Sequence, residues 1–197
     1  FLANSTALSA QVRSLTKTFD GGWLVSKGTA VEKFSSNKAR VKQGANPYIN
    51  APGGTCATST TLITKTIQGP NNNIIYLHAA ASPNNKIGMI KPSGYAAVSD
   101  CVFASASPSV NHFPTSLLLH SSGRLLVAFS NATGPVTEVY SYPVTATDIG
   151  AGVSAFNNQS VLYGVTAMTE LPNGHVLIAS GAAGYNTVEE FSYDTST

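Results

Sequence analysis

Short runs of apolar residues separated by polar turns dominate the chain and predict β strands rather than helices. The stretch Arg124–Ser130 is apolar at nearly every position, as in a strand that is covered on both faces. The stretch Val136–Tyr142 alternates apolar and polar residues, which is typical of a strand nearer the rim of a sheet. No segment sustains a period of 3.6 residues, so we expect little or no helix.

The same order of strands and turns recurs four times. Each unit has a short apolar stretch, a polar turn, a strongly apolar strand, a loop of small residues and an alternating strand. The units are Leu15–Ser35, Thr61–Lys91, Thr115–Tyr142 and Thr166–Tyr193. Their turns are Asp20–Gly22, Gly69–Asn72, Ser121–Gly123 and Pro172–Gly174. Gly, Asn and Asp are frequent in these turns because they tolerate the positive φ that tight hairpins need.

The residues that follow the turns set the period of the repeat. The second strand of the units opens at Trp23, Asn73, Arg124 and His175, at spacings of 50, 51 and 51 residues. A period near 50 residues with about four strands per unit is typical of a β-propeller. We therefore predict one all-β domain, residues 1–197, built as a β-propeller of about four four-stranded blades. The expected repeats cover about 10–55, 56–108, 109–160 and 161–197.

The last unit resembles a kelch repeat. Glu170–Thr195 has a Pro-Asn-Gly turn, an apolar strand, a Gly-rich loop and an aromatic strand that ends in Tyr-Asp, in the order of that family. Ser121–Tyr142 is less similar, the first two units match only in outline, and the family's diglycine and later Trp are missing. The resemblance implies a propeller fold. It implies no single function, because kelch propellers serve as adhesion modules, partner-binding scaffolds and enzymes.

Closure of the ring depends on the N-terminal residues. The last unit ends after its third strand, near Tyr193, so the segment 2–12 is expected to supply the fourth strand and to join the two ends of the ring. The alternative is that this chain forms part of a larger ring that other chains complete.

The low content of charge favours a protein made for the outside of a cell. Only 10% of the residues are charged, whereas a typical soluble domain has roughly 25%. Ser, Thr and Asn number 23, 20 and 15. This composition excludes coiled coils, helical bundles and charge-driven disorder. No run approaches the length of a membrane helix, and the start at Phe1 suggests a removed leader or a fragment.

Cysteines and glycosylation sequons fit an extracellular or cell-surface location. Cys56 and Cys101 are not spaced as a metal site, and in a secreted protein they predict one disulfide that staples the second unit. Two buried free thiols are the alternative. The sequons at Asn4, Asn131 and Asn158 permit N-glycosylation but do not argue for it, because chance gives about as many in such a sequence.

The acidic residues do not form a catalytic pattern. Glu189 and Glu190 are the only adjacent pair, whereas a glycosidase needs two carboxylates that face each other across a cleft. Glu32, Glu138 and Glu189 are expected at the same position in the third strand of three units, which indicates a structural role. We therefore predict that the protein is not an enzyme.

The four histidines show no metal-ligand spacing: His78, His112, His120 and His175. His120 and His175 flank tight turns, and we expect both at the surface. We predict neither a metal site nor a cofactor. A catalytic triad stays open, because its members need not be close in sequence.

Aromatic residues near strand ends are the candidate glycan-binding residues, since a ring face packs against the apolar face of a sugar. Tyr48 and Tyr185 are expected in exposed Gly- and Asn-rich loops, and Trp23 is expected beside a turn. The alternative for these rings is packing between blades.

Positive and negative charges are separated along the chain. Residues 1–91 carry a formal charge of +8 and residues 92–197 carry −6, although the whole chain carries only +2. This separation suggests head-to-tail contact between copies or a basic side that binds an anionic polymer; random drift is the alternative. Lys38, Arg40 and Lys42, expected on a loop between the first two units, form the candidate self-association patch. No dense basic cluster with interleaved aromatic residues predicts nucleic-acid binding.

Together these features predict an extracellular or cell-surface β-propeller without catalytic activity. The leading hypothesis is self-assembly into a surface layer, filament or appendage, or adhesion to a surface. A lectin-like glycan-binding module is the second hypothesis. A propeller hydrolase, or a fragment of one, is the third.

Overall fold

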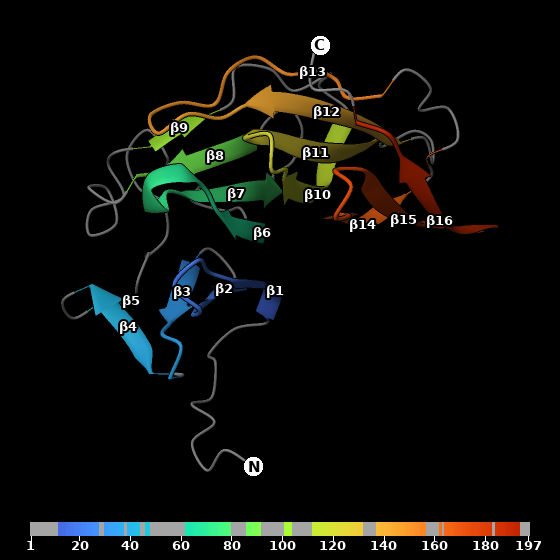
Figure 1. The fold of residues 1–197 in the computed structure, drawn as a ribbon. Helices are drawn as coiled ribbons and strands as arrows, with labels where there is room; N and C mark the ends of the chain where they lie inside the picture. The colour runs from blue at the N-terminus through green and yellow to red at the C-terminus, as the bar shows by residue number, and fades with distance from the viewer. Residues whose placement is uncertain are drawn as a thin grey trace.

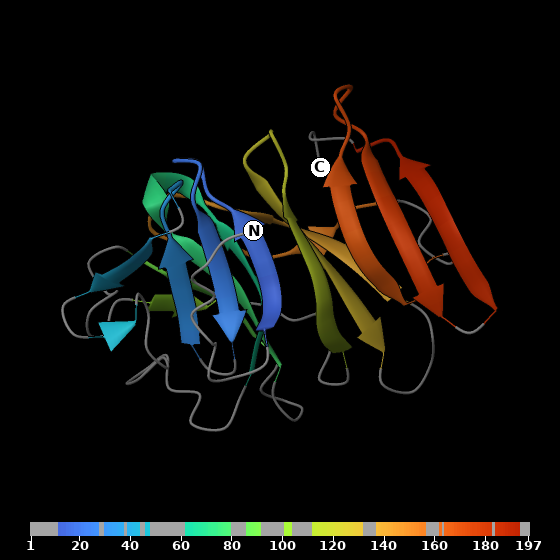
Figure 2. The ribbon, with the colours of Figure 1, turned by 90° about the horizontal axis from the view of Figure 1, so that it is seen from below.

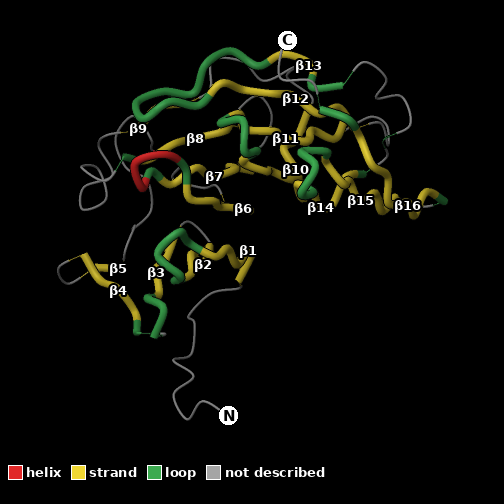
Figure 3. The backbone as a smooth tube through the Cα atoms, viewed as in Figure 1, coloured by secondary structure: helices red, strands yellow, loops and turns green. Residues whose placement is uncertain are grey.

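The computed structural model folds the chain into antiparallel β sheets (Figure 1). It describes residues 12–27, 30–37, 39–43, 46–47, 62–79, 86–91, 101–103, 112–131, 137–156, 162, 164–182 and 184–193. Within these ranges the only helical segment is a single 3-10 turn, η2 (Pro70–Asn72), shown in red in Figure 3. The predicted all-β fold is thereby confirmed.

Four sheets follow one another along the chain, and each is a meander in which strands adjacent in sequence are paired. Sheet 1 contains β1 (Val12–Lys17), β2 (Trp23–Lys27), β3 (Ala30–Phe34), β4 (Arg40–Gln43) and β5 (Asn46–Pro47). Sheet 2 contains β6 (Leu62–Gln68), β7 (Ile74–Ala79), β8 (Lys86–Ile90) and β9 (Cys101–Phe103). Sheet 3 contains β10 (His112–Leu119), β11 (Arg124–Asn131), β12 (Thr137–Pro143) and β13 (Val153–Ser154). Sheet 4 contains β14 (Val165–Glu170), β15 (Val176–Ala182) and β16 (Tyr185–Phe191).

The sheets pack against one another in chain order (Figure 2). Their first strands lie toward a common inner side, where β6 contacts both β1 and β10, and β10 contacts β14. One apolar cluster between sheets 2 and 3 contains Leu77, Leu125 and Phe129. Another between sheets 3 and 4 contains Leu126 and Ile178. Meandering sheets that stack face to face around shared inner strands have the arrangement of propeller blades.

Ring closure is not shown by the described part of the chain. Residues 2–11, which were expected to complete the last unit, lie outside the described residues, and Val12 pairs with Lys27 inside sheet 1. No described strand of sheet 1 joins sheet 4. Closure through the N-terminal strand therefore stays a prediction.

Turn hydrogen bonds correct the register of the first unit. In all four units a backbone N–H before the turn donates to the carbonyl of the residue four positions later. The accepting residues are Gly22, Asn73, Arg124 and His175, each 51 residues after the previous one. Trp23 opens β2 as predicted. The residue equivalent to Asn73, Arg124 and His175 is nevertheless Gly22, one position earlier, because its carbonyl accepts the hydrogen bond that closes the turn.

In the turn of sheet 2, Asn71 adopts a left-handed backbone with φ of 52°. At one equivalent position every turn has a left-handed residue: Gly21, Asn72, Gly123 and Gly174, with φ of 79°, 62°, 81° and 80°. They too are 51 residues apart. Glycine has no side chain to clash in this conformation, and asparagine tolerates it better than most residues. The predicted use of positive φ in these turns is confirmed.

Strand pairing separates the three glutamates that were expected at one position. Glu32 pairs with Val25 and Glu189 pairs with Ile178, and both partners lie three residues after the turn. These two glutamates are therefore equivalent. Glu138 pairs with Phe129, five residues after the turn, so its assignment to the same position is wrong.

Hydrogen bonds from a backbone N–H to a side-chain oxygen link neighbouring sheets near their turns. The N–H of Phe19 donates to Gln68 Oε1 at 2.6 Å, and the N–H of Ser121 donates to Glu170 Oε2 at 2.8 Å. Both contacts join a turn of one sheet to the last residue of the inner strand of the next sheet. At the equivalent position sheet 2 has Pro70, which has no N–H to satisfy.

We expect Asp20→Asn to destabilise the protein slightly at neutral pH and less in strong acid. Lys33 Nζ donates to Asp20 Oδ2 at 2.7 Å, and this hydrogen bond, followed by one from Thr18, lowers the pKa of Asp20 to about 2. A carboxyl whose pKa is lower in the folded state stabilises the protein above its unfolded pKa, and this stabilisation is lost as the pH falls. The difference between variant and wild type in urea midpoint should therefore narrow between pH 4 and pH 2.

Lys33→Met removes the partner of Asp20 and should reproduce this pH dependence. The effect stays small because the carboxylate is more than half exposed and solvent screens the pair. A difference between Asp20→Asn and wild type that does not change between pH 4 and pH 2 would contradict the role of the charge.

Candidate functional site

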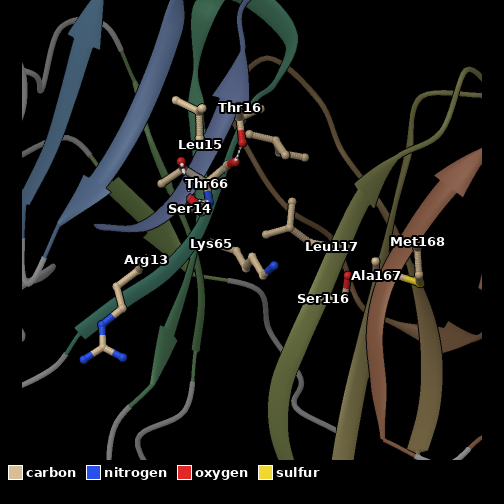
Figure 4. A pocket seen from close by; sticks show the side chains of 11 residues that line it. Arg13, Ser14, Leu15, Thr16, Lys65, Thr66, Ser116, Leu117, Ala167 and Met168 are labelled. Carbon is tan, nitrogen blue, oxygen red and sulfur yellow. Dashed lines mark hydrogen bonds between the residues drawn. The ribbon is translucent and has the colours of Figure 1, made fainter. Parts of the chain in front are cut away.

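A pocket of about 350 Å³ lies between the inner strands of all four sheets (Figure 4). Its lining residues come from equivalent parts of the four repeats, because β1, β6, β10 and β14 are the first strands of their sheets. They are Arg13, Ser14, Leu15, Thr16, Lys65, Thr66, Ile67, Ser116, Leu117, Ala167 and Met168. The stacking of the repeats therefore creates this site from residues that are far apart in the sequence.

Hydroxyl groups join β1 to β6 on one side of the pocket. Ser14 Oγ lies 3.0 Å from Ser26 Oγ and accepts a hydrogen bond from the N–H of Thr66 at 3.2 Å. Thr16 Oγ1 donates to the carbonyl of Thr66 at 2.6 Å. At this point β1 is held against sheet 2 by hydrogen bonds rather than by apolar packing.

Sheets 3 and 4 give the pocket an apolar wall. Leu117 is buried and belongs to the cluster between sheets 2 and 3. Met168 packs beside the cluster between sheets 3 and 4, and Ala167 is exposed next to it. Because Leu117 and Met168 are held by the core, this wall is preformed.

The charged side chains of the pocket are both basic. Lys65, on β6, is partly buried, and its side chain extends toward β10 (Figure 4). Arg13, on β1, is exposed. Among the described residues, neither forms an ion pair. No Asp or Glu is among the lining residues. The site therefore has the electrostatics of an anion site rather than of a cation site.

The described residues also contain no group of three or more His, Cys, Asp or Glu side chains that could hold a metal ion. No helix in the same ranges is long and apolar enough to span a membrane.

The candidate aromatic residues are not brought together. Trp23 opens β2 and is 36% exposed. Tyr185 opens β16 and pairs with Ala182, so its expected place in a loop is wrong. Tyr48 lies outside the described residues. Trp23 and Tyr185 belong to the first and last sheets, and Trp23 is not among the residues that line the pocket.

The candidate basic patch also differs from expectation. Arg40 and Lys42 lie in strand β4 rather than on a loop, and Lys38 lies outside the described residues. The guanidinium of Arg40 is 3.2 Å from Glu32 Oε2, and its centre lies 5.8 Å from the ring centroid of Phe34. At least this member of the patch is already engaged within its own sheet.

The remaining candidates fall mostly beyond the described part of the chain. Cys56, Asn4 and Asn158 lie outside it. The disulfide and glycosylation at any of the three sequons therefore stay predictions. Cys101 lies in β9, the fourth strand of sheet 2, where it pairs with Ile90. Asn131 is the last residue of β11.

The expected surface position of His120 is wrong. This residue is buried between sheets 3 and 4, where its Nε2 lies 2.9 Å from the carbonyl of Gly174 and its ring packs edge-on against Tyr193. His175 is partly exposed, as expected, and its Nδ1 lies 2.6 Å from Glu190 Oε1. Hydrogen bonds from Asn173 and then His175 lower the pKa of Glu190, so this carboxylate stays ionised.

The outer faces of the two end sheets are a feature that the sequence analysis missed. Ser14 and Ser26 point toward sheet 2, so alternation along β1 and β2 places Leu15, Lys17 and Trp23 on the opposite face. We call these three residues the first-sheet face. Ile178 packs toward sheet 3, so the paired neighbours Leu177 with Glu190, and Ala179 with Val188, lie on the opposite face of sheet 4. We call these four residues the last-sheet face.

Apolar residues on these faces are exposed where their counterparts in other sheets are buried. Val188 is 65% exposed, whereas Val139, at the same position of sheet 3, is fully buried. Trp23 is 36% exposed, whereas its counterpart Leu125 is fully buried. The difference has one cause: a neighbouring sheet covers the inner counterparts, and no described residues cover the end faces in the same way. Hydrophobicity alone could not reveal this, because the exposed and the buried member of each pair are both apolar.

Comparisons with known proteins identify the fold but no family. No protein-family model matches the chain, and no curated protein matches it. Among solved structures it is similar to virginiamycin B lyase from Staphylococcus aureus, with a TM-score of 0.58 and 14% identity over 95% of this chain and 57% of that one. It is similar to a luciferin-regenerating enzyme, with a TM-score of 0.61 and 11% identity over 94% and 60%.

A third similar structure is PorZ, a bacterial surface component of the type-IX secretion system of Porphyromonas gingivalis. The TM-score is 0.59 and the identity is 11% over 98% of this chain and 28% of that one. The chain spans less than two thirds of the length of these three proteins. At such low identity the likeness shows the fold alone: the chain is an all-β protein with propeller-like stacking of antiparallel sheets.

Proposed function

We propose that the protein is an extracellular or cell-surface β-propeller protein that acts by binding rather than by catalysis, and that it assembles with copies of itself. The contact joins the last-sheet face of one copy to the first-sheet face of the next. The exposure of Val188 and Trp23 at positions that are buried in the inner sheets carries this proposal. The kelch-like pattern of the last repeat is compatible with such a role.

Hydrophobic burial favours this contact. Covering apolar surface yields roughly 25 cal/mol per Å², and Leu15, Trp23 and Val188 are all large side chains exposed by a third or more. A sheet of a second copy offers the shape that covers the same positions inside the chain. The new interface would therefore continue the stacking that already joins sheets 1 to 4.

The two faces are also complementary in polar groups. Glu190 on the last-sheet face is ionised and partly exposed, and Lys17 on the first-sheet face is exposed. The turn of sheet 4 has Pro172 where the turn of sheet 3 has Ser121. Pro172 has no N–H to donate, so the contact needs no acceptor at Lys17, the last residue of β1. The two faces differ from each other, so the contact is heterologous and builds either closed rings or open filaments.

Location outside the cell is supported by composition and by one structural neighbour. Hydroxyl and amide groups replace charges over most of the sequence. PorZ, which has a similar fold, is a bacterial surface component. Assembly at a surface would use both properties, since a weakly charged protein offers little repulsion between copies.

We expect Val188→Asp to prevent self-association without unfolding the protein. A carboxylate at this position would be desolvated by a partner sheet, whereas in the free chain it would stay mostly exposed to water, as Val188 is. Sedimentation velocity over a range of concentrations should show larger species for the wild type and a monomer for the variant. High salt should weaken, but not abolish, assembly of the wild type, because exposed charge pairs are screened over about 8 Å at physiological ionic strength.

Val153→Asp provides the matched control. Val153 is also an exposed strand valine, but it lies on β13 and on neither end face. This variant should assemble like the wild type. A wild type that stays monomeric at high concentration would refute self-assembly and favour the glycan-binding alternative through Trp23 and Tyr185, which a glycan array would then examine.

A further inference from the structure

We propose that the pocket between the inner strands binds a small organic anion, namely a carboxylate that carries an apolar body. This inference goes beyond self-assembly, because the pocket lies between the inner strands and shares only Leu15 with the end faces, whereas Lys65, Leu117 and Met168 belong to neither face. It assigns a ligand class to a site built from residues of four different repeats.

Lys65 supplies the main attraction for the carboxylate. Its ammonium reaches the space between β6 and β10, and among the described residues no carboxylate pairs with it (Figure 4). In sheet 1, by contrast, three basic side chains form ion pairs within their own sheet: Lys27 and Arg40 with Glu32, and Lys33 with Asp20. Arg13 also lines the pocket, but its guanidinium points away from Lys65 and the apolar wall (Figure 4), so Lys65 carries the proposal.

The hydroxyl groups on the β1 and β6 side of the pocket are not the main binding groups for the carboxylate. The hydroxyl groups of Ser14, Thr16 and Thr66 are already engaged in hydrogen bonds that join β1 to β6, including one between Ser14 Oγ and Thr66 Oγ1 at 3.3 Å. They provide a rigid polar side. Ser116, on β10, also lines the pocket, and it directly precedes Leu117 of the apolar wall.

The apolar wall distinguishes an organic anion from an inorganic one. Leu117, Ala167 and Met168 line the side formed by sheets 3 and 4. A phosphate or sulfate ion would leave this wall in contact with water, whereas an alkyl or aryl group would cover it. The volume of about 350 Å³ is at the lower end for small-molecule sites, which run from about 300 to 1,000 Å³, and it therefore fits a small ligand.

Titration by two-dimensional ¹H–¹⁵N NMR with hexanoate, hexanol and inorganic phosphate tests this proposal at constant ionic strength. We expect hexanoate to shift the amide resonances of the pocket residues and to saturate. Hexanol and phosphate should each bind about tenfold more weakly or worse, because each lacks one of the two interactions. The experiment uses the Val188→Asp background, so that self-association affects neither the spectra nor the conclusion.

Variants then assign the site. Lys65→Met keeps the length of the side chain and should weaken hexanoate binding about tenfold or more, while Lys65→Arg should restore much of it. Lys17→Met removes the same charge from an exposed position outside the pocket and should bind like the wild type. Ala167→Asp places an acid on an exposed part of the wall, where folding tolerates it, and should also weaken binding.

Three outcomes would overturn the proposal. The first is the absence of saturable shifts at the pocket with hexanoate. The second is equal loss of binding in Lys65→Met and Lys17→Met, which would indicate general charge attraction. The third is phosphate binding as strong as that of hexanoate, which would remove the role of the apolar wall. None of these outcomes bears on self-assembly, which sedimentation measures separately.

Discussion

Replacing Phe129 with alanine is expected to lower the free energy of unfolding by about 3–5 kcal/mol, the usual range for removal of a buried aromatic ring. Phe129 is almost completely buried in the cluster between sheets 2 and 3. Its ring packs edge-on against Tyr140, with centroids 6.0 Å apart, and at a tilt against Tyr142 at 6.4 Å. Truncation would leave a cavity that these two rings, held by their own strand β12, cannot fill.

Urea unfolding followed by circular dichroism measures this loss, and Phe19→Ala is the control. Phe19 is 73% exposed on the turn of sheet 1, so its truncation should change stability by no more than about 0.5 kcal/mol. Equal effects of the two substitutions would contradict the packing of sheet 2 on sheet 3 that is described above.

Replacing Gly88 with alanine is expected to cost about 1–3 kcal/mol, the typical penalty for overpacking a core. A Cβ at Gly88 would lie 2.2 Å from Cζ of Tyr76, whose ring is fully buried and covers the glycine. Tyr76 cannot move aside without displacing its neighbours in the core. Gly181→Ala is the control, because its Cβ would approach only a Thr166 methyl group at 3.3 Å on an exposed strand.

Sheet 3 supplies a rescue for this clash. At the two positions occupied in sheet 2 by Tyr76 and Gly88, sheet 3 has Val127 and Tyr140, which reverses the large and the small residue. Tyr76→Val combined with Gly88→Tyr should therefore be more stable than Gly88→Tyr alone. Thermal unfolding of the single and double variants measures this coupling. If the changes in stability of the two single variants add up to that of the double variant, the two side chains do not occupy the same space.

The local pattern of the sequence was sufficient to predict the repeat and its strands. Apolar runs such as Leu125–Phe129 and turn residues such as Gly123 act over a few residues, so they can be recognised without the fold. The described strands of each predicted unit lie within one sheet. The same local signals could not fix the register of the first unit, because both Gly22 and Trp23 follow its turn and only the hydrogen bond from Thr18 distinguishes them.

Tertiary structure decided which side chains are covered and which meet. His120 and His175 both flank turns, but His120 is buried because sheet 4 packs over it, whereas no described sheet follows sheet 4 to cover His175 in the same way. Val139 and Val188 are the same residue at the same position of the repeat, and they differ only in having a neighbouring sheet. The pocket likewise joins Lys65 to Met168, residues that are about one hundred positions apart. Burial and proximity of this kind depend on contacts between repeats, and the sequence of a single repeat contains no record of what packs against it.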